Sequence, residues 1–95
     1  MKYKLSVTKN FAAAHCLREY NGKCENLHGH NWKIRVAFWG TKLDDKGMLV
    51  DFTDIKRHLY KIISYLDHKF LNEISPFDKI NPTAENIAMF IFKQF

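Results

Sequence analysis

The 95-residue sequence is short of the residue types that define several protein classes. Its two cysteines, Cys16 and Cys24, are too few for a disulfide framework, so a reducing cytoplasm is the default compartment. No apolar run approaches the roughly 18 residues that a membrane span requires. Residues 1–5 alternate polar and apolar side chains and lack the apolar core of a signal peptide. We therefore expect a cytoplasmic protein with no membrane partner.

Acidic residues are fewer than basic ones, 10 Asp and Glu against 15 Lys and Arg, which gives a formal net charge of +5. This excess suits either nucleic acid or a small polyanionic substrate such as a nucleotide-like triphosphate. The basic residues are scattered singly, however, and Lys33 and Arg35 alternate along a predicted strand as a solvated face would. We therefore predict no nucleic-acid partner.

Two stretches of alternating apolar and polar side chains predict strands over residues 3–15 and 28–39 of a single α+β domain, residues 1–95. The glycine-bounded stretch 40–47 is predicted to be a loop. Two strands make a poor sheet beneath two helices, so the predicted sheet is incomplete.

Two helices are predicted in the second half of the chain. Apolar residues recur at helical spacing over residues 52–66, and Asp51 or Thr53 could cap this helix. Thr83 is predicted to cap a second helix that continues through Ile91. The order of elements is therefore strand, strand, helix, helix.

Three histidines continue the apolar face of the predicted strands. His28 and His30 are two residues apart, so their side chains project side by side, and His15 has the parity of the first strand's apolar residues. Three imidazole nitrogens suit zinc, and three protein ligands leave a fourth position open, as in catalytic sites. The alternative is a set of hydrogen-bonded core histidines. The third histidine in register and the nearby cysteine favour a metal site.

Cys24, four residues before His28, has two interpretations. As a fourth ligand it would close the site and make the zinc structural. As a thiol close to zinc and to lysines it would have a lowered pKa and could act as a base. The residues alone leave both open.

Asp67 and His68 form a second group, just past the predicted helix 52–66. Such a pair at a helix end commonly serves as a cap and a dipole partner. A carboxylate can also hold an imidazole in one tautomer while it relays a proton. His58 lies among polar residues in mid-helix and is predicted only to be exposed.

Five segments together carry a resemblance to a known family. They are Phe11–His15, Cys24–Asn31, Gly47–Phe52, Leu66–Asn72 and Asn81–Asn86. In this order they resemble the pyruvoyl-tetrahydropterin synthase family, which includes the carboxy-tetrahydropterin synthases of queuosine and archaeosine biosynthesis. The resemblance runs from residue 3 to the end of the chain.

The resemblance implies a T-fold, an antiparallel sheet of four strands backed by two antiparallel helices. It implies homotrimers or homohexamers with active sites at subunit interfaces. Zinc would bind the three histidines, Cys24 would abstract a proton, and Asp67 and His68 of an adjacent subunit would relay protons. The implied substrate is 7,8-dihydroneopterin triphosphate, and Thr83 would approach its pterin ring.

Two products are consistent with these motifs, because both reactions share the same residues. Elimination of triphosphate gives 6-pyruvoyl-tetrahydropterin, whereas a further loss of acetaldehyde gives 6-carboxy-5,6,7,8-tetrahydropterin. Small size and short loops favour the carboxy product. The rival of another class is a non-catalytic, zinc-stabilised module that binds a pterin or purine.

The sequence departs from the family at its end. Family members continue past the second helix with two strands, one of which carries a glutamate that anchors the pterin ring. The last residues here are Lys93-Gln94-Phe95, and that glutamate is absent; Glu85 belongs to the Pro-Thr-x-Glu motif and is no substitute. We therefore expect a T-fold domain without its C-terminal strands, and an intact 95-residue product to be inactive.

Overall fold

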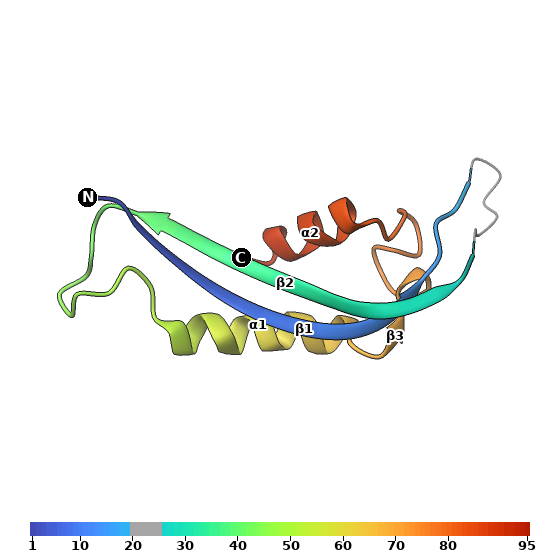
Figure 1. Ribbon diagram of the computed structural model, residues 1–95, viewed down its shortest axis with the longest axis horizontal. Helices are drawn as coiled ribbons and strands as arrows, with labels where there is room; N and C mark the ends of the chain where they lie inside the picture. Colours follow the sequence, from blue (N-terminus) through green and yellow to red (C-terminus); the bar gives the residue numbers. More distant parts are fainter. Residues whose placement is uncertain (20–25) are drawn as a thin grey trace.

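A computed structural model describes residues 1–19 and 26–95 of the chain, so Cys24 lies outside the described residues. The elements in chain order are β1 (Tyr3–His15), β2 (His28–Gly40), α1 (Phe52–Leu66), β3 (Lys69–Phe70), the 3-10 helix η1 (Leu71–Glu73) and α2 (Ala84–Lys93) (Figure 1). The two strands and two helices predicted from hydrophobic periodicity are confirmed. None of the helices in the described ranges is long and apolar enough to cross a membrane.

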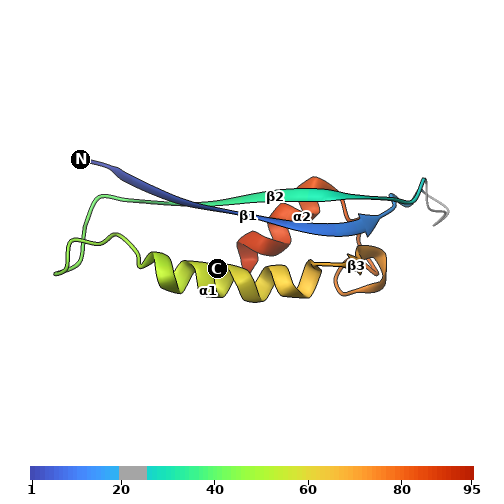
Figure 2. The same cartoon turned by 60° about the horizontal axis from the view of Figure 1, so that its bottom comes forward.

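β1 and β2 form a long antiparallel ribbon that is paired without interruption from Tyr3 opposite Gly40 to His15 opposite His28. This register places the odd residues of β1 and the even residues of β2 on one face, with Phe11 opposite Trp32. Both helices pack their buried residues against this face, and no helix among residues 1–19 and 26–95 covers the other face of the ribbon (Figure 2). The parity predicted for the strands therefore holds along their whole length.

The hydrophobic core fills the space between the ribbon and the helices. α1 contributes one stripe, in which Leu59 and Leu66 are completely buried because they lie seven residues apart on the same side of the helix. The other core residues are Val7, Phe11, Ala13, Ile62, Ile63, Leu71, Phe77, Ile87 and Ile91. The core thus joins β1, both helices and the segment between them.

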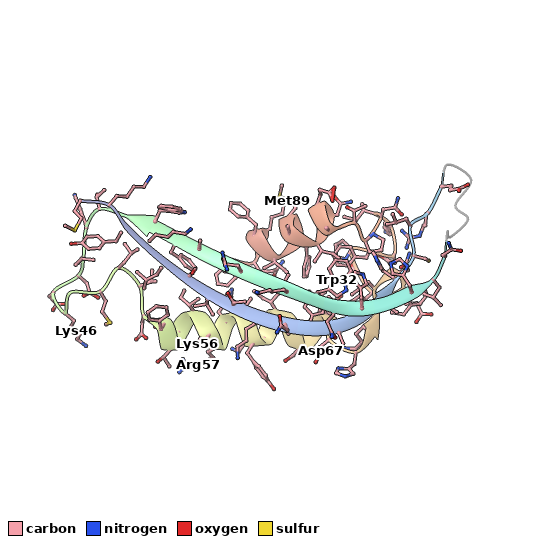
Figure 3. All side chains as sticks on the ribbon, viewed as in Figure 1. Trp32, Lys46, Lys56, Arg57, Asp67 and Met89 are labelled. Atoms are coloured by element: carbon pink, nitrogen blue, oxygen red, sulfur yellow. The ribbon has the colours of Figure 1, made fainter. Side chains whose placement is uncertain are left out.

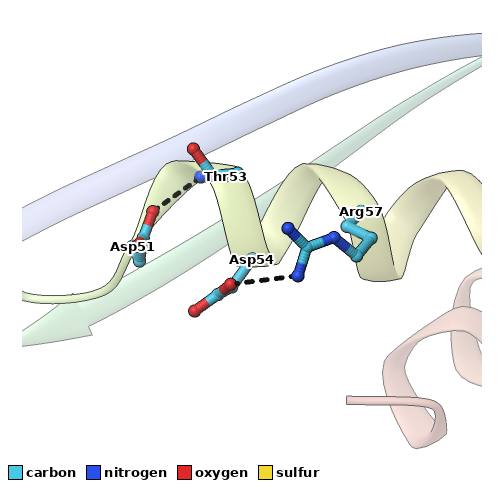
Figure 4. A network of polar contacts seen from close by, with 4 residues as sticks. All are labelled: Asp51, Thr53, Asp54 and Arg57. Carbon is cyan, nitrogen blue, oxygen red and sulfur yellow. Dashed lines mark hydrogen bonds and ion pairs between the residues drawn. The ribbon is translucent and has the colours of Figure 1, made fainter.

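The helix starts are capped as the sequence indicates. Asp51 is the N-cap of α1 and accepts a hydrogen bond of 2.8 Å from the backbone N–H of Thr53 (Figure 4). An exposed ion pair of 3.5 Å joins Asp54 to Arg57 in the next turn. The hydroxyl of Thr83 accepts from the backbone N–H of Asn86 at 3.1 Å and so caps α2.

A short strand after α1 adds to the predicted order. β3 pairs in parallel with β1, so the sheet is mixed and has the order β2-β1-β3. The backbone N–H of His68 donates to the carbonyl of Ala12 at 2.6 Å, and the Asp67 carboxylate accepts from the Ala12 N–H at 2.9 Å. His68 has a φ of 56°, the left-handed conformation that turns the chain from the helix onto the sheet.

Candidate metal centre

The three predicted ligand histidines lie together at one end of the ribbon. His15 is the last residue of β1 and pairs with His28, the first residue of β2, while His30 pairs with Ala13. The His15 Nε2 atom is 3.1 Å from Nε2 of His28 and 3.1 Å from Nε2 of His30. All three candidate ligand atoms lie within 4.8 Å of one another. The structure therefore brings the predicted ligands to a single point.

This spacing fits a tetrahedral metal ion. Zinc–nitrogen bonds of about 2.0–2.1 Å place neighbouring nitrogens about 3.3–3.4 Å apart in a tetrahedral site. The two separations from His15, both 3.1 Å, are close to that edge length, and all three candidate ligand atoms lie within 4.8 Å of one another. A set of three imidazole nitrogens is also a donor set that zinc accepts readily. The residues present thus fit the ion that the sequence predicts.

Backbone carbonyls decide which nitrogen of two of these rings is free. Nδ1 of His15 lies 2.8 Å from the carbonyl oxygen of Pro82, and Nδ1 of His28 lies 3.0 Å from that of Asn26. A carbonyl oxygen can only accept, so both rings carry their proton on Nδ1 and present a bare lone pair at Nε2. Two such lone pairs 3.1 Å apart repel each other unless a cation or a proton lies between them. The arrangement therefore favours a metal site over a hydrogen-bonded core.

The electrostatics of the cluster favour the neutral form of His30. Partial desolvation, and next the repulsion from the other two histidines, lowers the pKa of His30. His15 is 6% exposed, whereas His28 and His30 are exposed, so the cluster opens toward solvent on the β2 side. An open side is what a ligand would need to reach a bound metal.

Two residues of the site were not singled out from the sequence. The ring of Trp32 lies 4.2 Å from that of His30 and 4.9 Å from that of His15, measured between centroids, so it forms one wall of the cluster. Its parity, two residues after His30 on the same face, is a signal that could have identified it. Pro82 acts through its backbone carbonyl, for which the sequence holds no side-chain signature.

Asp67 and His68 are held together at the edge of β1, and Figure 3 labels Asp67 and Trp32 toward the end of the ribbon that carries the histidines. The Asp67 carboxylate lies 3.0 Å from Nδ1 of His68. The hydrogen bond from the Ala12 N–H is the main cause that lowers the pKa of Asp67; burial opposes it, and the hydrogen bonds and charge of His68 add to the lowering. Asp67 is therefore ionised near neutral pH and holds the His68 proton on Nδ1.

The Asp67–His68 pair is separate from the histidine cluster within one chain. No hydrogen bond or ion pair among residues 1–19 and 26–95 joins the two groups, and the side chain of His68 is 81% exposed. His68 and His30 do line one shallow depression beside Gly29. Of the remaining predicted site residues, Thr83 is half-buried and serves as the cap of α2, and Cys24 lies outside the described residues.

The fold and the cluster define a class: an α+β domain with three histidines that could hold a metal ion at the end of a two-stranded ribbon. Residues 4–95 match the family model described as 6-pyruvoyl tetrahydropterin synthase, and the chain belongs to this family of pterin-forming enzymes. The putative 6-carboxy-5,6,7,8-tetrahydropterin synthase of Archaeoglobus fulgidus is 37% identical over 90 residues, which are 95% of this chain and 73% of that protein. The 6-carboxy-5,6,7,8-tetrahydropterin synthase of Synechocystis is 39% identical over 88 residues, 87% of this chain and 67% of that protein.

A solved structure extends the likeness to three dimensions. The 6-pyruvoyl tetrahydropterin synthase of Caenorhabditis elegans superposes with a TM-score of 0.87 at 26% identity, over 99% of this chain and 76% of that one. The predicted T-fold is confirmed by this match. In all three comparisons the chain spans only part of its relative, between 67% and 76% of the length.

Proposed function

We propose that the protein is a zinc-dependent carbon–oxygen lyase that converts 7,8-dihydroneopterin triphosphate into 6-carboxy-5,6,7,8-tetrahydropterin, with loss of acetaldehyde and triphosphate. This product would serve as a precursor of queuosine or archaeosine. The observation that carries the proposal is the gathering of three histidines, whose candidate ligand atoms lie within 4.8 Å of one another and of which His15 Nε2 is 3.1 Å from each of the other two. The names of the Archaeoglobus and Synechocystis relatives support the carboxy product.

The zinc ion would be held by His15, His28 and His30. When bound, it supplies a Lewis acid that polarises an oxygen of the substrate side chain. The triphosphate would be attracted by the net positive charge of the chain, which is +5. Thr83 would contact the pterin ring.

The proton transfers would fall to Cys24, Asp67 and His68. Cys24, as a thiolate, would abstract the substrate side-chain proton. The ionised Asp67 carboxylate lies 3.0 Å from His68 Nδ1 and holds the proton there, which leaves His68 Nε2 to accept a proton and return it. Because this pair is exposed and separate from the cluster in one chain, we propose that an adjacent copy in a homotrimer or homohexamer contributes it.

Two alternative functions differ from the proposed one in the products that would form. The 6-pyruvoyl product is the first alternative, favoured by the name of the superposable Caenorhabditis structure. A non-catalytic zinc-stabilised module that binds a pterin or purine is the alternative of another class. Such a module has no use for an oriented Asp67–His68 pair, which argues against it.

The test is a product assay on zinc-loaded protein given 7,8-dihydroneopterin triphosphate, with acetaldehyde measured directly. Release of acetaldehyde with a carboxylated pterin is the expected result. Consumption of substrate without acetaldehyde would indicate the pyruvoyl product, and no consumption the binding module.

Two substitutions separate the roles of metal and base. Cys24→Ala is expected to keep zinc and lose a factor of about 10²–10⁴ in turnover, the usual contribution of a positioned general base. His28→Ala is expected to lose zinc. Loss of zinc from Cys24→Ala with turnover unharmed would instead make the thiol a ligand.

A further inference from the structure

Arg18 joins the chain just beyond β1 to the segment that precedes α2. Its guanidinium donates to the backbone carbonyls of Asn72 and Ile80, both at 3.2 Å, and to that of Phe77. These three acceptors are spread along residues 71–82, here called the 71–82 segment. A guanidinium has five N–H donors in a rigid planar fork, so a single side chain can hold three points of a curved segment at once.

Two asparagine side chains reinforce this attachment. The amide of Asn72 accepts from the Cys16 N–H at 3.0 Å and donates to the Cys16 carbonyl at 2.8 Å. The amide of Asn81 makes the same reciprocal pair with the backbone of Arg18, at 2.7 and 3.0 Å. Each amide thus forms the pair of backbone hydrogen bonds that a residue of a neighbouring strand would form. The backbone of residues 16–18 is thereby fixed to the 71–82 segment at both ends.

The same segment ends at the carbonyl that orients a metal ligand. Pro82 follows Asn81 directly, its side chain is fully buried, and its carbonyl accepts from Nδ1 of His15 at 2.8 Å. His15 precedes Arg18 by three residues. The hydrogen bonds of Arg18 and the hydrogen bond of His15 therefore both join the end of β1 to the 71–82 segment.

We propose that Arg18 is a positioning residue for the metal centre. By holding the 71–82 segment against the end of β1, it keeps the Pro82 carbonyl on Nδ1 of His15 and so keeps the His15 Nε2 lone pair directed at the other two histidines. The described hydrogen bonds of the Arg18 guanidinium go to backbone carbonyls and to none of the three histidines. The inference rests on the zinc centre of the proposed function and names a residue outside its ligand set.

The rest of the 71–82 segment is anchored elsewhere, which makes this role separable from folding. Leu71 and Phe77 are completely buried in the core, and the side chain of Asn86 donates to the Asn81 carbonyl at 2.9 Å. These contacts bury the segment in the core and join it to the start of α2 without the Arg18 side chain. Without Arg18 the segment is expected to stay in place but to hold the Pro82 carbonyl less firmly on His15.

The experiment compares Arg18→Met and Arg18→Lys with a matched control, Arg57→Met, whose arginine lies exposed on α1 and forms an ion pair with Asp54. Zinc affinity is measured by competition with a chromophoric chelator. The tautomer of His15 in the metal-free protein is read from imidazole ¹⁵N chemical shifts, which a loss of stability alone would not change. The thermal unfolding midpoint is recorded for every variant.

Arg18→Met is expected to weaken zinc binding by about tenfold or more, the usual effect of losing a group that orients a metal ligand, and to give His15 a second tautomer. Arg18→Lys should lose less, because an ammonium keeps the charge but cannot reach three separate carbonyls. Arg57→Met should match the wild type.

The inference is overturned if zinc affinity and the His15 shifts of Arg18→Met stay within about twofold of those of Arg57→Met, whatever happens to the unfolding midpoint. If Arg18→Met does not fold, Arg18→Lys decides by the same criterion. A wild-type protein that binds no zinc would overturn the proposed metal centre and this inference with it. A wild type that binds zinc, with Arg18 variants that bind equally well, would refute only the role of Arg18.

Discussion

Removal or addition of zinc should change the stability of this protein strongly, because the ligands are already gathered in the folded chain. Two of the three rings are oriented by backbone carbonyls, and their Nε2 atoms face each other at 3.1 Å. Binding of the metal therefore requires little ordering of the ligand side chains, and it also removes the repulsion between their lone pairs. In the unfolded chain the three histidines are independent, so zinc binds the native state preferentially.

The magnitude follows from mass action. A ligand at about 100 times its Kd stabilises the native state by about 2.7 kcal/mol. In a domain of 60–100 residues each kcal/mol moves the unfolding midpoint by about 4–8 °C, so zinc at that excess should raise it by about 11–22 °C. His28→Ala, which leaves two ligands, should lose most of this shift.

The assay is thermal unfolding followed by circular dichroism, with a chelator and then with increasing free zinc. His58→Ala is the matched control, since His58 is an exposed histidine on α1 outside the cluster, bonded to the Gln94 carbonyl at 2.5 Å. It should keep the full zinc-dependent shift even if its own midpoint changes. The reasoning is refuted if the wild type shifts by less than about 2 °C at saturating zinc, or if His28→Ala shifts as much as the wild type.

Two further outcomes follow from the structure. Leu66→Ala should destabilise the domain by about 2–5 kcal/mol, because it leaves a cavity at a completely buried position on α1. Urea unfolding should show this loss. Tyr60→Ala, on the exposed side of the same helix, should have a free energy of unfolding within about 0.5 kcal/mol of the wild type. The lowered pKa of Asp67 means that its carboxylate contributes stability above the unfolded-state pKa of about 3.9, and that this contribution is lost as the pH falls through the lower folded-state value. Asp67→Asn should therefore be less stable than the wild type at pH 7, and the difference should disappear in strong acid; an equal difference at both pH values would contradict this account.

Much of the fold is predictable because its main signals are periodic. The alternation of apolar and polar residues predicted a strand over residues 3–15, and the apolar stripe predicted a helix over residues 52–66. Both elements have these bounds in the structure. β2 was predicted to end at residue 39 and ends at Gly40. β3 carries no such signal, because two residues cannot show a period. Its position is set instead by the contact of the Asp67 carboxylate with Ala12, which lies 55 residues away in the chain.

The candidate site likewise has a part that the sequence predicts and a part that only the folded chain shows. The three histidines were predictable because strand parity placed them on one face, and because no bulge interrupts the pairing of the 13-residue strands. The proton position on His15 was not predictable, since it depends on the Pro82 carbonyl, 67 residues later. Arg18 was missed for the same reason, because all three of its acceptors are backbone oxygens whose positions only the folded chain shows.

This division bears on how the metal centre responds to sequence change. Strand parity aims the imidazoles, and it is robust because every pair along the ribbon maintains the same register. The choice of free nitrogen on His15 depends on the 71–82 segment, which a few side-chain-to-backbone hydrogen bonds hold at the end of β1. Substitutions on the helix-free face of the ribbon should therefore leave metal affinity unchanged, whereas those that loosen the 71–82 segment should weaken it although they lie more than 50 residues from His15 in sequence. The tautomer of His15 thus depends on a segment that is distant in sequence from the strands that carry the ligands.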